Sequence, residues 1–168
     1  MRYHDAVIAK APQGRTLAVH PHFDPNVAVL KLFPGITRGV VESILSLPTL
    51  RGVVLETFGS GNAPMLPWFL DALRATVARG VVIVNVTQCV TGYVDMMRYE
   101  TGILLQKIGV VSGRDATTEA VLTKLMYLLG QGFSSEEVGQ LMAIPLRGEM
   151  SLDQEMEGFS RETSIYRR

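Results

Sequence analysis

The sequence of 168 residues predicts a three-layer α/β/α domain with a small parallel sheet of about four strands. Short runs rich in β-branched residues alternate with helical segments, an order typical of β-α-β units with right-handed crossovers. The runs at residues 53–55 and 81–86 are apolar without polar alternation, as expected of parallel strands buried on both faces. Both then break into small and polar residues, and ligands of open α/β sheets bind beyond such strand ends.

The amino-terminal half of this pattern begins with a predicted strand at residues 27–33, which Pro34 closes. Thr37 is a good N-cap for a helix with apolar residues on one face, and Pro48 stops that helix. Residues 53–55 are the core of the next strand.

A second helix is predicted from near Pro67 to Gly80, where glycine suits the position after the last helical residue. Residues 81–86 form the third strand. A loop follows, with a short helix expected at residues 99–106, and then a short fourth strand at residues 110–111.

Two helices are predicted after the fourth strand. Thr117 can cap a helix over residues 118–129, whose inward face carries apolar side chains. Ser134 and Glu137 have the spacing of a capping box and start the last helix. Nearer the end, Arg147 and Glu149 could form a surface ion pair worth less than about 1 kcal/mol.

The predicted domain boundaries follow from the same pattern. Residues 1–25 are irregular and are expected to be a linker or the end of a preceding domain. Residues 26–150 contain the α/β domain. Residues 151–168 are polar with little periodicity and are expected to be frayed or packed on a partner.

Composition limits the function classes. The hydrophobic share of 47% indicates a globular domain, and 16 basic residues balance 16 acidic ones. Affinity for nucleic acid or for an anionic membrane is therefore not expected. No apolar run approaches the roughly 20 residues that span a bilayer. A single cysteine and the lack of a signal-peptide core favour the cytoplasm.

Several short motifs carry little weight. Gly59-Ser-Gly61 lacks the third glycine of a dinucleotide fingerprint, and no P-loop sequence is present. His20 and His22 lack neighbouring ligands at metal-binding spacing, so no metal or other cofactor is predicted. Cys89 is interpreted as a small buried hydrophobe at a strand end, with a nucleophile as the alternative.

Asn62 has two interpretations of equal weight. Its amide can both donate and accept, which suits holding the carboxylate or ammonium group of an amino acid. It could equally be a turn residue beside Gly61.

Five segments together resemble the carboxy-terminal domain of cytoplasmic, type I L-asparaginases. They run in order from about Asp24 to Met150, at residues 24–37, 56–64, 84–89, 109–125 and 146–150. The resemblance implies a longer, homo-oligomeric enzyme, dimeric or tetrameric, that hydrolyses L-asparagine to L-aspartate and ammonia. Its nucleophilic threonine would lie in an amino-terminal catalytic domain. This chain contains no matching Thr-Gly-Gly-Thr, so no catalytic residue is assigned here and the isolated chain is expected to be inactive.

The resemblance also implies roles for four residues. Asn62 matches the family asparagine that reaches into a neighbouring subunit's active site, and Tyr99 matches a tyrosine that completes that pocket in mammalian-like members. Some bacterial members bind a second asparagine as an activator at this domain. Glu56 stands where those members have arginine, whereas the cysteine at the position of Cys89 is retained. A carboxylate facing the effector's carboxylate would be repulsive, so allosteric activation is not expected.

Two other functions remain open at this point. One is a stand-alone module that binds and senses an amino acid, which the carboxylate of Glu56 disfavours. The other is the related amidase subunit of tRNA-dependent amidotransferases, for which the expected basic surface is not evident.

Overall fold

The computed structural model describes residues 17–151 except residues 91 and 98. Residues 17–26 contain neither helix nor strand. The predicted segment at residues 1–16 and the polar tail beyond Ser151 lie outside the described residues.

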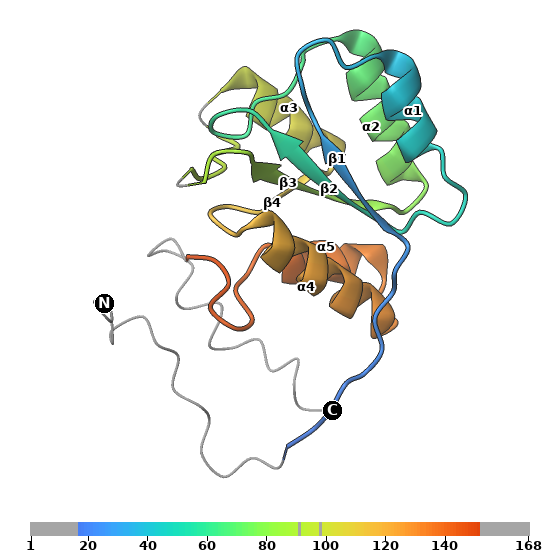
Figure 1. The fold of residues 1–168 in the computed structure, drawn as a ribbon, viewed down its shortest axis with the longest axis vertical. Coiled ribbons are helices and arrows are strands. Elements are labelled where there is room, and N and C mark those ends of the chain that lie inside the picture. Colours follow the sequence, from blue (N-terminus) through green and yellow to red (C-terminus); the bar gives the residue numbers. More distant parts are fainter. Residues whose placement is uncertain (1–16, 91, 98, 152–168) are drawn as a thin grey trace.

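The described part has the predicted three-layer α/β architecture (Figure 1). Its sheet contains four parallel strands in the order β1-β2-β3-β4. The strands are β1 (Val27–Lys31), β2 (Gly52–Thr57), β3 (Val82–Thr87) and β4 (Val111–Ser112). The helices are α1 (Arg38–Leu45), α2 (Pro67–Ala78), α3 (Glu100–Ile108), α4 (Thr118–Gly130) and α5 (Ser135–Met142).

The strand order explains how the helices divide between the two faces. Because each of α1, α2 and α3 connects one parallel strand to the next strand alongside it, right-handed crossovers place all three on one face. Helices α4 and α5 follow the last strand and cover the opposite face (Figure 1). One apolar core lies under α1–α3 around Phe69 and Leu73, and the other lies under α4 and α5 around Leu125 and Met142.

The predicted helix starts are confirmed by their hydrogen bonds. The side chains of Thr37 and Thr117 accept from the backbone N–H groups three residues later. Ser134 and Glu137 form the reciprocal capping box. These contacts satisfy backbone donors that the first turn of a helix leaves without a partner.

The sheet and helix α4 pack closely at Gly52. A Cβ atom at this position would lie 2.7 Å from the Cδ2 atom of Leu125, so a side chain there would have to displace side chains of α4. Helix α4, with 13 residues, is the longest helix described, and no helix in the described ranges is long and apolar enough to cross a bilayer.

The carboxylate of Glu149, a possible half of a surface ion pair on the sequence alone, is largely buried. Its carboxylate lies 2.7 Å from the ammonium group of Lys124, whose side chain is buried beside α5. Glu149 also accepts from the backbone N–H groups of Leu146 and Arg147. The apolar periodicity of α4 did not indicate a buried lysine. The ion pair between Lys124 and Glu149 connects the segment after α5 to α4.

Candidate functional site

The carboxyl edge of the sheet carries the predicted site residues. Strand β2 leads into a tight loop that Phe58 and Asn62 close with two backbone hydrogen bonds of 2.9 and 2.8 Å. Gly59 and Gly61 have φ angles of 52° and 100°, in the left-handed region that favours glycine. The two glycines therefore allow the chain to reverse and to present Asn62 at the loop's end.

The amide of Asn62 has a defined orientation. The hydroxyl of Thr101, in the first turn of α3, donates to its Oδ1 atom at 2.8 Å. Within the described part of the chain, no acceptor bonds its Nδ2 atom. A hydrogen-bond donor is thus the group that Asn62 offers to a ligand, and a carboxylate is a suitable acceptor.

Tyr99 immediately precedes α3, the helix that contacts Asn62 through Thr101. Tyr99 is the N-cap residue of α3 and its side chain is 45% exposed. Thr101, the partner of Asn62, follows two residues later. The two predicted substrate-binding residues are thus linked through Thr101, and their role in binding substrate stays a prediction.

Glu56 lies near the end of β2, on the face covered by α4. Its carboxylate is 3.0 Å from the ammonium group of Lys31 and accepts a 2.6 Å hydrogen bond from Thr118, the first residue of α4. Burial raises the pKa of Glu56, but the hydrogen bonds from Thr118 and Lys31 and the charge of Lys31 outweigh it. The pKa therefore lies below 4.5, its ordinary value, and Glu56 is an anion at neutral pH.

The interpretation of Cys89 as a buried hydrophobe is wrong, because its side chain is exposed. Strand β3 ends at Thr87, so Cys89 lies in the loop beyond the sheet rather than at the strand terminus. Its backbone N–H donates to the hydroxyl of Thr87 at 3.0 Å, and its carbonyl accepts from Gly92.

Three residues around Asn62 were not predicted from the sequence. Thr57 and Asn85 are buried and hydrogen-bonded to each other beneath the loop that carries Asn62, and Thr101 orients Asn62 itself. An asparagine inside an apolar strand is a visible signal for Asn85. No local pattern marks Thr101, because its partner lies 39 residues away.

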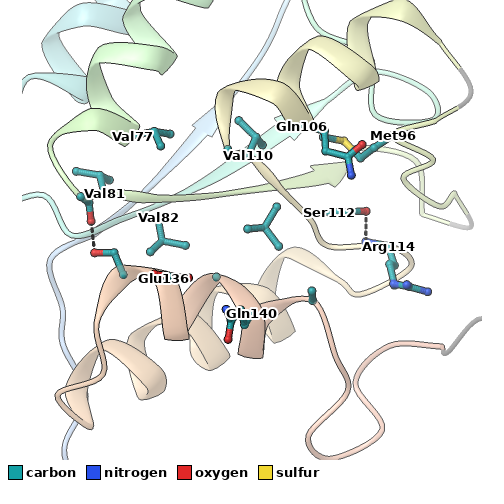
Figure 2. A pocket seen from close by; sticks show the side chains of 16 residues that line it. Val77, Val81, Val82, Met96, Gln106, Val110, Ser112, Arg114, Glu136 and Gln140 are labelled. Atoms are coloured by element: carbon teal, nitrogen blue, oxygen red, sulfur yellow. Dashed lines mark hydrogen bonds between the residues drawn. The ribbon is translucent and has the colours of Figure 1, made fainter. Parts of the chain in front are cut away.

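A cavity of about 550 Å³ lies elsewhere, along the open edge of β4 (Figure 2). Its lining includes Met96, Gln106, Arg114 and Gln140, from the layers on both sides of the sheet. None of the four predicted site residues lines it.

Comparisons with known proteins show which family the chain resembles. Residues 26–142 match the model of the glutaminase/asparaginase C-terminal domain. The chain is 42% identical over 144 residues to L-asparaginase 1 of Escherichia coli strain K12, covering 85% of this chain and 42% of that protein. It is 45% identical over 147 residues to the 60 kDa lysophospholipase of Mus musculus, covering 87% of this chain and 26% of that protein.

The fold agrees with a solved relative as well. The crystal structure of L-asparaginase I from Vibrio cholerae superposes with a TM-score of 0.79 at 45% identity, over 85% of this chain and 42% of that one. The chain therefore spans less than half the length of these relatives. With a family match from residue 26 to residue 142 and the same sheet and helices, the chain belongs to the glutaminase/asparaginase family and contains its C-terminal domain.

Proposed function

We propose that this chain is the C-terminal domain of a cytoplasmic L-asparaginase, and that the complete enzyme hydrolyses L-asparagine to L-aspartate and ammonia. The observation that carries the proposal is Asn62, held at the end of a closed loop with its amide nitrogen available to a ligand. The family match and the similarity to an L-asparaginase support it. The proposed domain extends over residues 26–150.

In this proposal Asn62 completes the active site of a neighbouring subunit. Its amide nitrogen donates to the carboxylate at the charged end of the substrate, and Tyr99 closes the same end of the pocket. Holding that end fixes the distance between the side-chain amide carbon of the substrate and the nucleophile, which lowers the entropic cost of the reaction.

The covalent chemistry is assigned to the amino-terminal catalytic domain. An activated threonine hydroxyl there attacks the amide carbon of L-asparagine, and ammonia leaves with the proton that the hydroxyl gives up. Water then attacks the resulting acyl-enzyme ester and releases L-aspartate. No residue of this chain is given a catalytic role, and the chemistry needs no cofactor.

The proposal includes a homo-oligomer, dimeric or tetrameric, because Asn62 is assigned to the active site of a neighbouring subunit. Several exposed apolar side chains lie in the segments that follow β2 and β3 in the chain, namely Met65, Leu66, Tyr93, Met97 and Tyr99. Apolar residues grouped at an edge are typical of a protein interface. We assign this surface to contact with a neighbouring subunit, and we assign no nucleic-acid or membrane partner to the chain.

The stand-alone amino-acid sensor is the second candidate function. Glu56 and Cys89 are the residues for a possible effector site, and the anionic side chain of Glu56 already has Lys31 and Thr118 as partners. An effector's carboxylate would meet like charge there, which disfavours this candidate. Because the chain is also similar to the mouse 60 kDa lysophospholipase, a lysophospholipid can serve as a control substrate in the same assays.

Ammonia release from L-asparagine by the 168-residue chain, at high protein concentration, tests the proposal. We expect no turnover above a buffer control, because the nucleophile belongs to the other domain. Turnover above that control would contradict this assignment. Its loss in Cys89→Ala would then identify the exposed thiol as the nucleophile.

A further inference from the structure

A fully buried amide lies beneath the loop that carries Asn62. Asn85 is 0% exposed in β3, where its register partners are Leu55 and Ser112 and its neighbours in the strand are two buried valines. An amide in such surroundings is costly unless its polar atoms are hydrogen-bonded. Asn85 meets this condition with three side-chain hydrogen bonds, to Thr57, Gly61 and Met96.

The amide nitrogen of Asn85 contacts two segments at once. It donates to the carbonyl oxygen of Gly61 at 3.0 Å and to the sulfur of Met96 at 3.4 Å. Gly61 immediately precedes Asn62, and Met96 lies three residues before Tyr99. One buried side chain therefore connects the supports of both proposed substrate-binding residues.

The same two segments also contact each other directly. The backbone N–H of Asp95 donates to the carbonyl of Ser60 at 3.0 Å. A Cβ atom on Gly61 would lie 2.7 Å from a methyl carbon of Val94 and 3.1 Å from the amide nitrogen of Asn85. The loop thus rests on a closely packed base with little space for movement.

Thr57 determines which way the Asn85 amide points. Its hydroxyl, also buried, lies 2.7 Å from the amide oxygen of Asn85 and donates to it, with the carbonyl of Val86 farther away at 3.1 Å. Because this bond holds the oxygen towards Thr57, the nitrogen faces Gly61 and Met96. Removing the hydroxyl would leave the orientation of the amide without this restraint.

We propose that Asn85, oriented by Thr57, is a positioning residue that fixes Asn62 and the segment leading to Tyr99 in the geometry that binds substrate. The proposal rests on the proposed function for its effect on L-asparagine, whereas the restraint on the loop is independent of it. Asn85 acts through Asn62 and does not contact the substrate.

The test uses three substitutions of buried threonines. Thr57→Val removes the hydroxyl at nearly constant shape, and Thr57→Ser keeps the hydroxyl. Thr76→Val is the matched control, since Thr76 is equally buried in α2 and its hydroxyl donates to the carbonyl of Ala72, away from the site.

The first measurement is amide hydrogen exchange in the 168-residue chain. In Thr57→Val, we expect the amides of Phe58, Asn62 and Asp95 to exchange about fivefold faster, in keeping with one weakened buried hydrogen bond. The exchange rates of the core amides of β2 and β3 should stay unchanged. In Thr57→Ser and Thr76→Val, the exchange rates of all these amides should equal those of the parent. Unchanged exchange at these three amides in Thr57→Val would overturn the proposal.

The second measurement is steady-state kinetics in the enzyme that joins this chain to the amino-terminal domain of a related L-asparaginase. In Thr57→Val, we expect the KM for L-asparagine to rise about fivefold, with kcat changed less than about twofold. Thr57→Ser should restore the KM. Faster loop exchange with an unchanged KM would overturn the link between the loop and the substrate.

The two measurements separate the possible failures. An unsubstituted joined enzyme without turnover counts against the proposed function, and the exchange data then decide the role of Asn85 alone. If Thr57→Val does not fold, Met96→Leu removes the sulfur acceptor at similar volume, and the same amides should exchange faster by a smaller factor. Exchange equal to the parent in that variant would overturn the proposal.

Discussion

The hydroxyl of Thr101 donates to the amide oxygen of Asn62 at 2.8 Å, across 39 residues of sequence. This contact joins the first turn of α3 to the loop after β2. It also decides which end of the Asn62 amide is free to meet a ligand, and it favours a carboxylate over an ammonium group.

The first prediction concerns Thr101→Val in an enzyme that joins this chain to an asparaginase amino-terminal domain. Without the hydroxyl, the Asn62 amide can turn and present its oxygen to the substrate's carboxylate. We expect the KM for L-asparagine to rise about fivefold, the effect of losing roughly one hydrogen bond. Thr123→Val on the exposed face of α4 is the control. A Thr101→Val enzyme with the parent's KM would show that this hydrogen bond does not orient Asn62 for substrate.

The second prediction concerns the two constraints on Gly61. Gly61→Ala would combine a φ angle of 100° with a contact of 2.7 Å to Val94. We expect the free energy of unfolding to fall by about 2–3 kcal/mol, as for overpacking added to backbone strain. Gly35→Ala is the control, because Gly35 has a φ angle of 88° with open space around it, and should cost about 1 kcal/mol. Urea denaturation measures both, and equal losses would contradict the close packing at Gly61.

The third prediction concerns the buried pair of Lys124 and Glu149. Burial raises the pKa of Glu149, but hydrogen bonds from Lys124 and from the backbone of Leu146 and Arg147 outweigh it, so its pKa lies below 4.5. Burial is the largest influence on Lys124 and lowers the pKa of its ammonium group, while Glu149 opposes that shift. Glu149 is therefore an anion at neutral pH, and its charge opposes the effect of burial on the ammonium group of Lys124.

Glu149→Gln should lower the free energy of unfolding at pH 7 by about 3 kcal/mol, because it leaves the buried ammonium without a counter-charge. A carboxyl with a lowered folded-state pKa stabilises the fold above its ordinary value of 4.5, and this stability is lost as the pH falls through the folded-state pKa. The parent should therefore lose more stability than Glu149→Gln on acidification below pH 4.5.

Denaturation in urea at pH 7 and in acid checks this prediction. Glu42→Gln is the control, since Glu42 pairs with Arg38 on the exposed face of α1. This substitution should lower the free energy of unfolding by less than about 0.5 kcal/mol. Equal effects of Glu149→Gln and Glu42→Gln at pH 7 would mean that the buried pair does not hold the segment after α5.

The fourth prediction concerns the possible effector site. Because Glu56 is anionic and partnered by Lys31 and Thr118, we expect calorimetric titration of L-asparagine into the 168-residue chain to show no saturable binding. Saturable binding that Cys89→Ala abolishes would contradict this and would favour the amino-acid sensor.

Local patterns were sufficient to predict the fold. The caps at Thr37, Thr117 and Ser134 lie where the sequence placed them, because a cap depends on residues only three positions apart. The strands likewise form at the predicted apolar runs, but their ends differ by one or two residues. Strand β1 ends at Lys31 rather than at residue 33, and β4 covers residues 111–112 rather than 110–111.

The sequence predicted less of the site and of the buried charges. The resemblance to known asparaginases predicts roles for Asn62 and Tyr99, but it does not indicate the residues that contact Asn62 or its loop. Those partners, Thr101 and Asn85, are separated from the loop by 39 and 24 residues, and no local rule couples such distances. Lys124 and Cys89 were missed for a related reason, since the burial of a single side chain depends on what the rest of the fold places around it.

The most direct test of the account is ammonia release from L-asparagine by a protein that joins the amino-terminal part of E. coli L-asparaginase 1 to this chain. That relative is 42% identical over the shared region, so the interface between the two parts should form. We predict turnover in the joined protein, a rise in the KM for L-asparagine with Asn62→Ala, and no turnover by this chain alone. A joined protein that folds and assembles yet releases no ammonia would contradict the assignment of this chain to an asparaginase.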